Sequence, residues 1–375
     1  LVVTGLGHGD EGKGATVDAL VRRHALELVV RHNGGPQAAH HVVAPDGAVH
    51  CFAQFGAGTL VPGVRTHLSR FMLVEPLALA REAAALARIG VADPLARLSA
   101  DRECAVVTPF HRLFGRIQEL SRGTARHGSC GLGVGPAWLD AHNPRLPSLR
   151  LAALTGPLEP LRGRLRLIQL VKLDQAEQLE PRPGTAELLA ELARPDLVDA
   201  FIAAARPIVT SINLDSGDLL RAVLRDRPGR VIFEGAQGLL LDADHGFWPY
   251  VTPSRTGPGQ AEQLLAEAGA PPPLTFSLGG ITAAPAGSSR RITAPSPTRS
   301  PTLTLSSVTV PACGAGTSMV ALSLSSVSSD SSAATACPAW TWTSITGTSL
   351  KSPMSGTLTS IAILFFSSPT GLWPA

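Results

Sequence analysis

The fold of this chain is decided by the stretch GHGDEGKG at residues 7–14, which directly follows the apolar run LVVTG at residues 1–5. A short β-branched run, a glycine-rich loop and the helix-forming segment 15–23 together predict a strand, a tight turn and a helix N-terminus. Backbone N–H groups and the positive end of the helix dipole then point at one place, which suits a phosphate group.

The loop departs from a P-loop at one position. Its spacing fits G-x-x-x-x-G-K from Gly7 to Lys13, but Gly14 stands where a P-loop has Ser or Thr. Because that hydroxyl normally helps to hold Mg²⁺, another oxygen must replace it, and Asp10 is the candidate. The alternative is a glycine-rich turn with a solvated acidic pair, which leaves the crowding of Asp, Glu and Lys among glycines unexplained.

The bulk composition is that of an ordinary globular protein. The chain has 375 residues, of which 44% are hydrophobic, and its net charge of +3 is too small to indicate nucleic-acid binding. Its five cysteines show neither metal-ligand spacing nor a disulfide framework. Charged residues appear early in the sequence, and no uncharged apolar run reaches the roughly 18 residues of a membrane span. We therefore expect a cytoplasmic protein that does not bind membranes.

The composition changes abruptly near residue 280. Residues 281–375 contain one acidic residue, four basic residues, no histidine and 36 serines and threonines, whereas residues 1–280 hold 28 residues of each charge. We expect an α/β domain over 1–280 and a poorly ordered Ser/Thr/Pro-rich tail over 281–375. We hypothesise that the reading frame shifts near residues 280–285. The alternative is a genuine, divergent Ser/Thr-rich extension.

Further elements predict the fold class. Residues 27–31 read as a second strand, and residues 42–44 and 48–52 read as a hairpin around Pro45-Asp46-Gly47. Helices are expected over 76–89, 109–122 and 258–268, and residues 150–228 are rich in helical pattern. The predicted fold is α/β, with a mostly parallel central sheet, flanking helices and a phosphate loop after the first strand.

Three later clusters resemble binding loops. One follows the second strand at residues 32–41, one contains alternating glycines at 128–138, and one places a glycine turn at 234–238 after a strand at 230–233. Ligand sites of open α/β sheets lie at such strand ends. The spacing of Asp242, Asp244 and His245 fits either a metal site or a hydrogen-bonded turn.

Taken together, five motifs occur in the order found in one known family. They are GDEGKG (9–14), R-x-x-GG-x-x-A-x-H (31–40), G-x-x-G-x-G-x-GPA (128–137), FEGAQG (233–238) and D-x-DHG-x-x-PYVT (242–252). Over about residues 1–280 the chain resembles adenylosuccinate synthetases, GTP-dependent ligases that join L-aspartate to IMP. The resemblance implies a 6-phosphoryl-IMP intermediate, AMP biosynthesis, a Mg²⁺ cofactor and a homodimer.

The resemblance also implies roles for individual residues. Asp10 would be the base for N1 of IMP and, with Ala39, a ligand of Mg²⁺, while His40 would be the general acid and Lys13 would steady the phosphoryl oxygens. The implied GTP and phosphate contacts are Gly9, Glu11, Gly12, Lys13, Gly14 and His40. The implied IMP contacts are Asp10, Gln37, Ser129, Cys130, Gln237 and Thr252.

Several positions differ from the family's pattern. Ala15 replaces a lysine, Gln37 an asparagine, Ala39 a glycine, Cys130 a threonine and Leu132 an arginine. Beyond residue 280, the sequence shows neither the arginine-rich loop expected to bind aspartate nor the segment expected to read guanine. The alternative to an active ligase is therefore an inactive nucleotide-binding homologue that lacks the aspartate and guanine sites.

Overall fold

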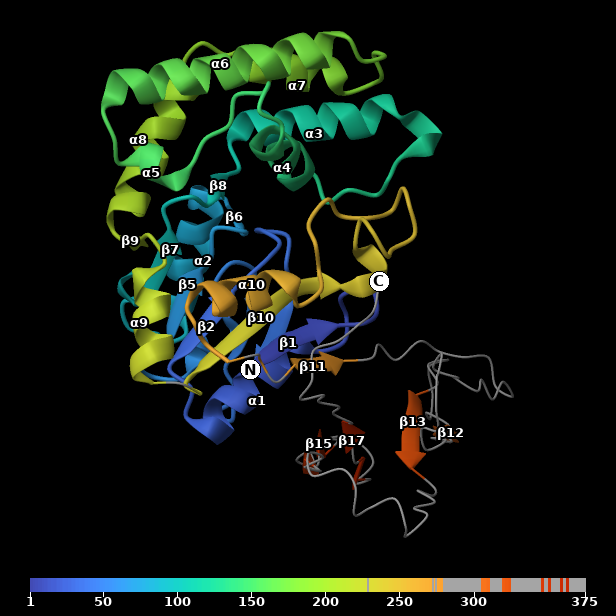
Figure 1. Ribbon diagram of the computed structural model, residues 1–375. Coiled ribbons are helices and arrows are strands. Elements are labelled where there is room, and N and C mark those ends of the chain that lie inside the picture. Colours follow the sequence, from blue (N-terminus) through green and yellow to red (C-terminus); the bar gives the residue numbers. More distant parts are fainter. Residues whose placement is uncertain are drawn as a thin grey trace. The chain divides into compact units, whose positions relative to one another are not determined.

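The computed structural model describes residues 1–278, apart from 228, 272 and 274, and six short strands between 305 and 363 (Figure 1). The chain divides into two units, Leu1–Leu278 and Gly279–Ala375. Most of residues 281–375, on which the frameshift hypothesis and the expected disorder fall, lie outside the described residues. The first unit holds every motif identified above.

A seven-stranded sheet forms the centre of the first unit. Its strands run in the order β11-β1-β10-β2-β5-β7-β9, and every neighbouring pair is parallel. The predicted mostly parallel sheet is thus confirmed. Its strands are β1 (Val2–Gly5), β2 (Leu28–Arg31), β5 (Arg65–Leu68), β7 (Leu98–Asp101), β9 (Asn213–Asp215), β10 (Val231–Gly238) and β11 (Thr275–Leu278).

Ten α-helices flank this sheet or pack beyond it in the described residues. They are α1 (Lys13–His24), α2 (Pro76–Arg88), α3 (Pro109–Ser121), α4 (Val134–His142), α5 (Leu151–Leu154), α6 (Leu158–Glu177), α7 (Thr185–Leu192), α8 (Leu197–Thr210), α9 (Asp218–Asp226) and α10 (Gly259–Glu267). The helices predicted at 76–89, 109–122 and 258–268 are confirmed within one or two residues at each end.

The two faces of the sheet are covered by different helices. Leu28 and Val30 of β2 pack with Phe233 of β10 against α9 and α10 in one buried cluster. Val29 points to the other face, beside α1, where it lies 2.6 Å from the position that a Cβ on Gly56 would take. Because both faces are buried, β2 is apolar throughout its first three residues instead of alternating with polar ones.

A helical layer lies beyond one part of the sheet. In Figure 1, α6 and α7 cross the top of the view, with α3 and α4 directly below them. Helix α3 packs against α4, α6 and α7, and α8 contacts both α6 and α2. Thr108 caps the N-terminus of α3, and its side chain and His111 form a reciprocal capping box.

The predicted hairpin is confirmed, and smaller strands complete the fold. β3 (His40–Val43) pairs antiparallel with β4 (Val49–Phe52), and Asp46 in the turn accepts a hydrogen bond from Ala48 N (3.0 Å). β6 (Leu73–Val74) pairs with β8 (Ala105–Val106). In the second unit, the described strands form three antiparallel pairs: β12 (Leu305–Val310) with β13 (Met319–Leu324), β14 (Ile345–Thr346) with β17 (Ala362–Ile363), and β15 (Leu350–Lys351) with β16 (Leu358–Thr359).

Strand β10 is longer than the sequence predicts. We expected a strand over 230–233 and a glycine turn over 234–238, but the strand continues to Gly238. The reason is close packing at its end, because a Cβ on Gly238 would collide with the carbonyl oxygen of Gly7 and the carboxylate of Glu11. The glycines therefore let this strand run beside the phosphate loop without forming a turn.

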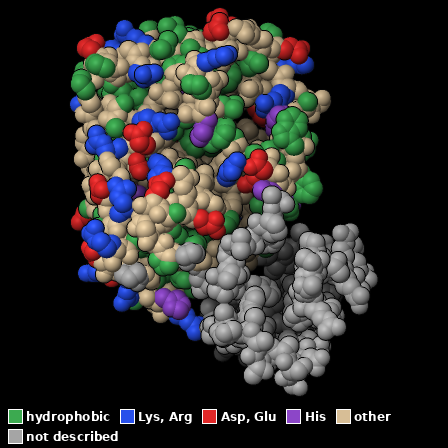
Figure 2. Space-filling model, in the orientation of Figure 1, with side chains coloured by type: hydrophobic (Ala, Val, Ile, Leu, Met, Phe, Trp, Pro, Cys, Tyr) green, Lys and Arg blue, Asp and Glu red, His purple; other side chains and the backbone are tan. Residues whose placement is uncertain are grey.

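On the face of the molecule seen in Figure 2, the described side chains show no concentration of one charge. Figure 2 shows Lys and Arg side chains interspersed with Asp and Glu over the face in view. Among the described helices, none is both long and apolar enough to cross a membrane.

Replacement of Gly238 by alanine tests the close approach of β10 to the phosphate loop. We expect Gly238→Ala to lower the free energy of unfolding by about 1–3 kcal/mol, because the new methyl group must displace backbone. Gly259→Ala is the matched control, since no heavy atom lies within 4 Å of its added Cβ. Urea unfolding of both variants checks this, and equal stability of the two would contradict the packing.

Candidate active site at the carboxyl end of the sheet

The phosphate loop joins β1 to α1 as the sequence predicts. Gly9 and Gly12 adopt positive φ angles of 108° and 79°, which side chains rarely tolerate, and Gly12 caps α1. The first residues of α1 therefore present their N–H groups toward the carboxyl end of β1. This is the geometry on which the phosphate-binding prediction depends.

Within the loop, Lys13 and Glu11 form a closed ion pair. Lys13 Nζ lies 2.7 Å from Glu11 Oε2 and donates to the carbonyl oxygen of Gly9 (3.3 Å), and both charged side chains are fully buried. Gly9 N–H donates to Glu11 Oε1 (2.9 Å). Burial raises the pKa of the Glu11 carboxyl, but the bonds from Lys13 and Gly9 outweigh this and lower it. The Glu11 carboxylate thus accepts hydrogen bonds from Gly9 N–H and Lys13 Nζ, the two donors that are expected to bind phosphate.

The contact between Gly14 and His40 explains the missing hydroxyl. A Cβ on Gly14 would lie 2.6 Å from His40 Cβ, so Ser or Thr cannot occupy this position without moving the histidine. His40 begins β3 and is 4% exposed. The departure from the P-loop pattern is therefore a packing requirement, because it lets the histidine approach the first turn of α1.

His40 is held on both ring nitrogens. Its Nδ1 lies 2.5 Å from Glu234 Oε1 of β10, and its Nε2 lies 3.1 Å from the carbonyl oxygen of Ala236. A carboxylate and a carbonyl only accept hydrogen bonds, so an imidazolium with two donors satisfies both contacts. The other Glu234 oxygen accepts from Ala57 N–H (2.9 Å).

Glu234 and Arg31 lie beside His40, and although both belong to the quoted motifs, the sequence analysis assigns neither a role. Burial raises the pKa of the Glu234 carboxyl, but the charge of Arg31 and the hydrogen bond with His40 outweigh it, so this pKa is lowered. Arg31 is fully buried and donates to the carbonyl oxygen of Phe55 (2.9 Å). The available signal was a charged residue at the end of each of two otherwise apolar strands.

Two buried histidines nearby resist protonation. Burial, followed by the charge of Arg31, lowers the pKa of His32 to about 4, and burial lowers the pKa of His67 to about 4. His67 Nδ1 lies 2.9 Å from Ser99 Oγ. Both imidazoles are therefore neutral at physiological pH.

Asp10 and Ala39, predicted to bind Mg²⁺, are both exposed. No group of three or more His, Cys, Asp or Glu residues in the described part of the chain could hold a metal by itself. A carboxylate and a backbone carbonyl are nevertheless the hard oxygen donors that Mg²⁺ prefers, and it usually keeps several waters and phosphate oxygens besides. These two residues therefore fit a magnesium bound jointly with a nucleotide.

Two residues that are predicted to contact nucleotide have side-chain oxygens that accept no hydrogen bond within the described residues. The side-chain oxygens of Gln37 and Gln237 are buried and have no hydrogen-bond partner within the described residues. Because an orphaned buried acceptor costs about 1–3 kcal/mol, a bound ligand or water is expected to satisfy each. Thr252 is buried, and its hydroxyl accepts from Ser254 N–H (3.3 Å), while Ser254 Oγ accepts from Gly34 N–H (3.1 Å).

Asp242 organises the segment that carries Thr252. Its Oδ2 accepts from Thr256 N–H (2.7 Å), and its Oδ1 accepts from Asp244 N–H (2.9 Å) and lies 3.2 Å from His245 Nδ1. Burial raises the pKa of the Asp242 carboxyl, but these hydrogen bonds, led by Thr256, lower it. Of the two readings of this motif, the hydrogen-bonded turn is the one observed.

Ser129 and Cys130 lie in the exposed loop that leads into α4. The loop is tied to α3 by a hydrogen bond from Gly128 N–H to Glu119 Oε1 (2.8 Å). No described hydrogen bond joins either residue to the phosphate loop. They thus form a separate part of the predicted site.

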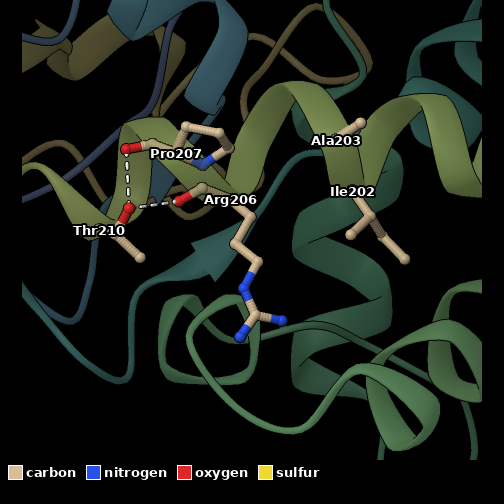
Figure 3. Close-up of a pocket in the computed structure, with 5 residues that line it drawn as sticks. All are labelled: Ile202, Ala203, Arg206, Pro207 and Thr210. Carbon is tan, nitrogen blue, oxygen red and sulfur yellow. Dashed lines mark hydrogen bonds between the residues drawn. The ribbon is translucent and has the colours of Figure 1, made fainter.

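A hollow of about 410 Å³ lies elsewhere, along α8 (Figure 3). Arg206 is the only charged residue among those that line it, and Thr210 Oγ1 is already bonded to the carbonyl oxygens of Arg206 (3.1 Å) and Pro207 (2.9 Å). None of its lining residues belongs to the predicted site, so we assign it no catalytic role.

The sequence of this chain is similar to those of one known protein family. The model of the adenylosuccinate synthetase family matches residues 2–306. The adenylosuccinate synthetase of Halothermothrix orenii is 33% identical over 261 residues, which cover 69% of this chain and 56% of that protein. The Vibrio vulnificus enzyme of the same name is 34% identical over 271 residues, with 69% and 56% covered.

A solved structure shares the fold. It is described as a fully ligated adenylosuccinate synthetase from Plasmodium falciparum, with a TM-score of 0.59 and 21% identity, and the match covers 74% of this chain and 60% of that one. This chain spans somewhat more than half the length of the curated relatives it matches.

Replacement of Gly14 tests the close contact with His40. We expect Gly14→Ala to cost about 1–3 kcal/mol of unfolding free energy, because the methyl group displaces His40. Gly163→Ala, within α6 and with no heavy atom within 4 Å of its added Cβ, is the control and should stabilise by about 0.5–1 kcal/mol. Chemical denaturation measures both, and a neutral or stabilising Gly14→Ala would refute the contact.

The neutral state of His32 predicts a pH dependence of stability. The unfolded chain binds a proton near pH 6.5, whereas the folded chain does so only near pH 4, so this histidine removes stability as pH falls between those values. In His32→Phe the slope of unfolding free energy against pH should be shallower there by up to about 1.4 kcal/mol per unit. Urea unfolding at pH 4.5, 5.5 and 6.5 checks this, and an unchanged slope would show that His32 ionises normally in the folded state.

Proposed function

Because this chain belongs to the adenylosuccinate synthetase family, we propose that its site carries the GTP-dependent ligation of L-aspartate to IMP, through a 6-phosphoryl-IMP intermediate. The products would be adenylosuccinate, GDP and phosphate. The observation that carries the proposal is the contact between Gly14 and His40, because the histidine that would act as the general acid then lies beside the loop that would bind the transferring phosphate.

The roles of the reacting groups follow from their surroundings. Asp10 is exposed in the phosphate loop, so its carboxylate is free to take the proton from N1 of IMP. That proton loss makes the 6-oxygen a better nucleophile toward the γ-phosphate of GTP. His40, with both nitrogens as donors, would turn one N–H from the carbonyl of Ala236 to the phosphoryl group.

Lys13 must change partner during the reaction. In the structure its charge is neutralised by Glu11, so it offers little attraction to a phosphate. Binding of GTP would draw Lys13 Nζ and Gly9 N–H away from the Glu11 carboxylate and onto phosphoryl oxygens. Phosphoryl transfer needs positioning and charge neutralisation more than covalent help, so this exchange supplies what the reaction requires.

Besides Asp10, the proposed IMP contacts come from four parts of the fold. The free acceptors of Gln37 and Gln237 would receive hydrogen bonds from bound nucleotide, and Gln237 at the end of β10 would contact the purine. Thr252 and the loop containing Ser129 and Cys130 would hold the 5′-phosphate.

Asp10 and the carbonyl of Ala39 would hold Mg²⁺. When bound, the ion would neutralise charge on the phosphoryl oxygens of GTP. The protein itself would contribute proton removal by Asp10 and hydrogen bonding by His40.

The second candidate is a nucleotide-binding homologue without ligase activity, which would lack the aspartate and guanine sites. It is favoured by the sequence beyond residue 280, which shows neither the arginine-rich loop expected to bind aspartate nor the segment expected to read guanine. In that case IMP would bind, but aspartate would not react, because the aspartate and guanine sites would be missing.

Phosphate release from GTP distinguishes the two candidates. We expect release to require both IMP and aspartate, and Asp10→Asn to reduce it by about 100-fold or more, because the base is lost. Asp46→Asn, an exposed acid in the hairpin turn, is the control and should leave the rate unchanged. Binding of IMP with no aspartate-dependent release would favour the homologue without activity, and absence of IMP binding would reject both.

A further inference from the structure

Three titratable side chains that the proposed reaction does not use are buried together in the helical layer. Asp140 of α4 accepts a hydrogen bond from Lys172 Nζ of α6 (2.6 Å), and its other oxygen lies 3.1 Å from Nε2 of His111 on α3. Each of the three residues is at most 2% exposed. We refer to His111, Asp140 and Lys172 as the buried triad.

The hydrogen bonds fix the charges of the buried triad. Thr108 N–H donates to His111 Nδ1 (3.0 Å), so this nitrogen carries no proton and Nε2–H donates to Asp140. Burial lowers the pKa of His111, in agreement with a neutral imidazole, although Asp140 opposes this effect. Lys172 also donates to Gln175 Oε1 (2.9 Å) and lies over the ring of Phe114. The remaining charges are one carboxylate and one ammonium, which balance.

Stability alone is a weak reason for this arrangement. Burying a carboxylate and an ammonium costs several kcal/mol per ion, and apolar residues of similar volume often serve as well or better. Hydrogen bonds are directional, however, whereas the apolar contacts that α4 makes through Val134 and Ala137 are not. Bonds to Asp140 from two other helices therefore fix how α4 is rotated and where it lies along its axis.

Helix α4 in turn carries the glycine loop at residues 128–133. A Cβ on Gly133 would lie 2.6 Å from Arg112 N and 2.7 Å from His111 C, so the end of this loop touches the α3 backbone at the triad histidine. Its other end is tied by Gly128 to Glu119. The exposed residues between these ends depend on the packing of α3 against α4 for their position.

We propose that the buried triad is a positioning network, which fixes α4 so that the 128–133 loop can receive the phosphate monoester of a purine nucleotide. The proposal rests on the proposed function, in which this loop holds the 5′-phosphate of IMP. The triad does not touch the ligand, and its effect reaches the phosphate through the loop.

Calorimetric binding of IMP and of inosine, which lacks the phosphate, tests the role of the triad. Lys172→Met removes the ammonium with little change of volume, and we expect it to weaken IMP binding about tenfold while inosine binding is little changed, because the loop is misplaced. Gln169→Leu is the matched control. Gln169 is also buried on α6, but it bonds the carbonyls of Leu192 and Arg194 instead of α4, so its ratio of IMP to inosine affinity should stay that of the wild type.

The outcomes show whether the buried triad positions the 128–133 loop or only stabilises the fold. A lower melting temperature of Lys172→Met with an unchanged affinity ratio overturns the proposal, because the triad then only stabilises the fold. If Lys172→Met does not fold, the double variant Asp140→Asn/Lys172→Met, which buries no charge, replaces it, with the same reduction expected. Wild-type protein that does not bind IMP overturns the proposed function as well, whereas wild-type binding with an unaffected variant overturns the positioning role alone.

Discussion

The site depends on the buried contact between Glu234 and His40. Glu234 ends the apolar part of β10, and its two oxygens accept from His40 of the hairpin and from Ala57 of the 3₁₀ helix η1 (Ala57–Leu60). A buried carboxylate is tolerated only when charges and hydrogen bonds compensate for its lost hydration, and here Arg31, His40 and a backbone N–H do so. The same contact holds the histidine against Gly14, so the strand, the hairpin and the phosphate loop share one anchor.

Internal carboxylates occupy the backbone donors of three polar loops. Glu11 accepts from Gly9, Glu119 accepts from Gly128, and Asp242 accepts from Thr256. Glu11 and Glu119 lie beside the two loops that the sequence predicts to bind phosphate groups. Each of these loops is therefore held in its conformation by a carboxylate of the protein. A ligand phosphate must compete with these carboxylates, and its higher charge and its additional acceptor oxygens give it the means to do so. Asp242 differs because it is part of a turn and has no predicted ligand to compete with.

The sequence predicts the elements of this fold better than the contacts between them. The β-branched strands, the Ala/Leu-rich α2 and the Pro-Asp-Gly turn carry strong local signals, and the parallel sheet follows from their order. The length of β10 could not be predicted, because Gly235 and Gly238 are equally typical of a turn, and only the approach of Gly7 shows why they lie in a strand. Tertiary contacts likewise explain why residue 14 is glycine and why Lys13 pairs with Glu11. Asp140 bonds with His111 and Lys172, which are 29 and 32 residues away in the sequence, so these bonds could not be predicted from local signals either.

His40 lies beside the phosphate loop, and its contacts with the Glu234 carboxylate and the carbonyl oxygen of Ala236 require a donor on each ring nitrogen. Nitrogen-15 NMR of the histidine side chains tests it most directly, with the His40 signals assigned by their loss in His40→Asn. We expect both ring nitrogens of His40 to carry hydrogens that exchange slowly with solvent, because both are bonded in a buried site. A neutral ring with one bare nitrogen, or hydrogens that exchange as fast as those of an exposed histidine, would contradict it.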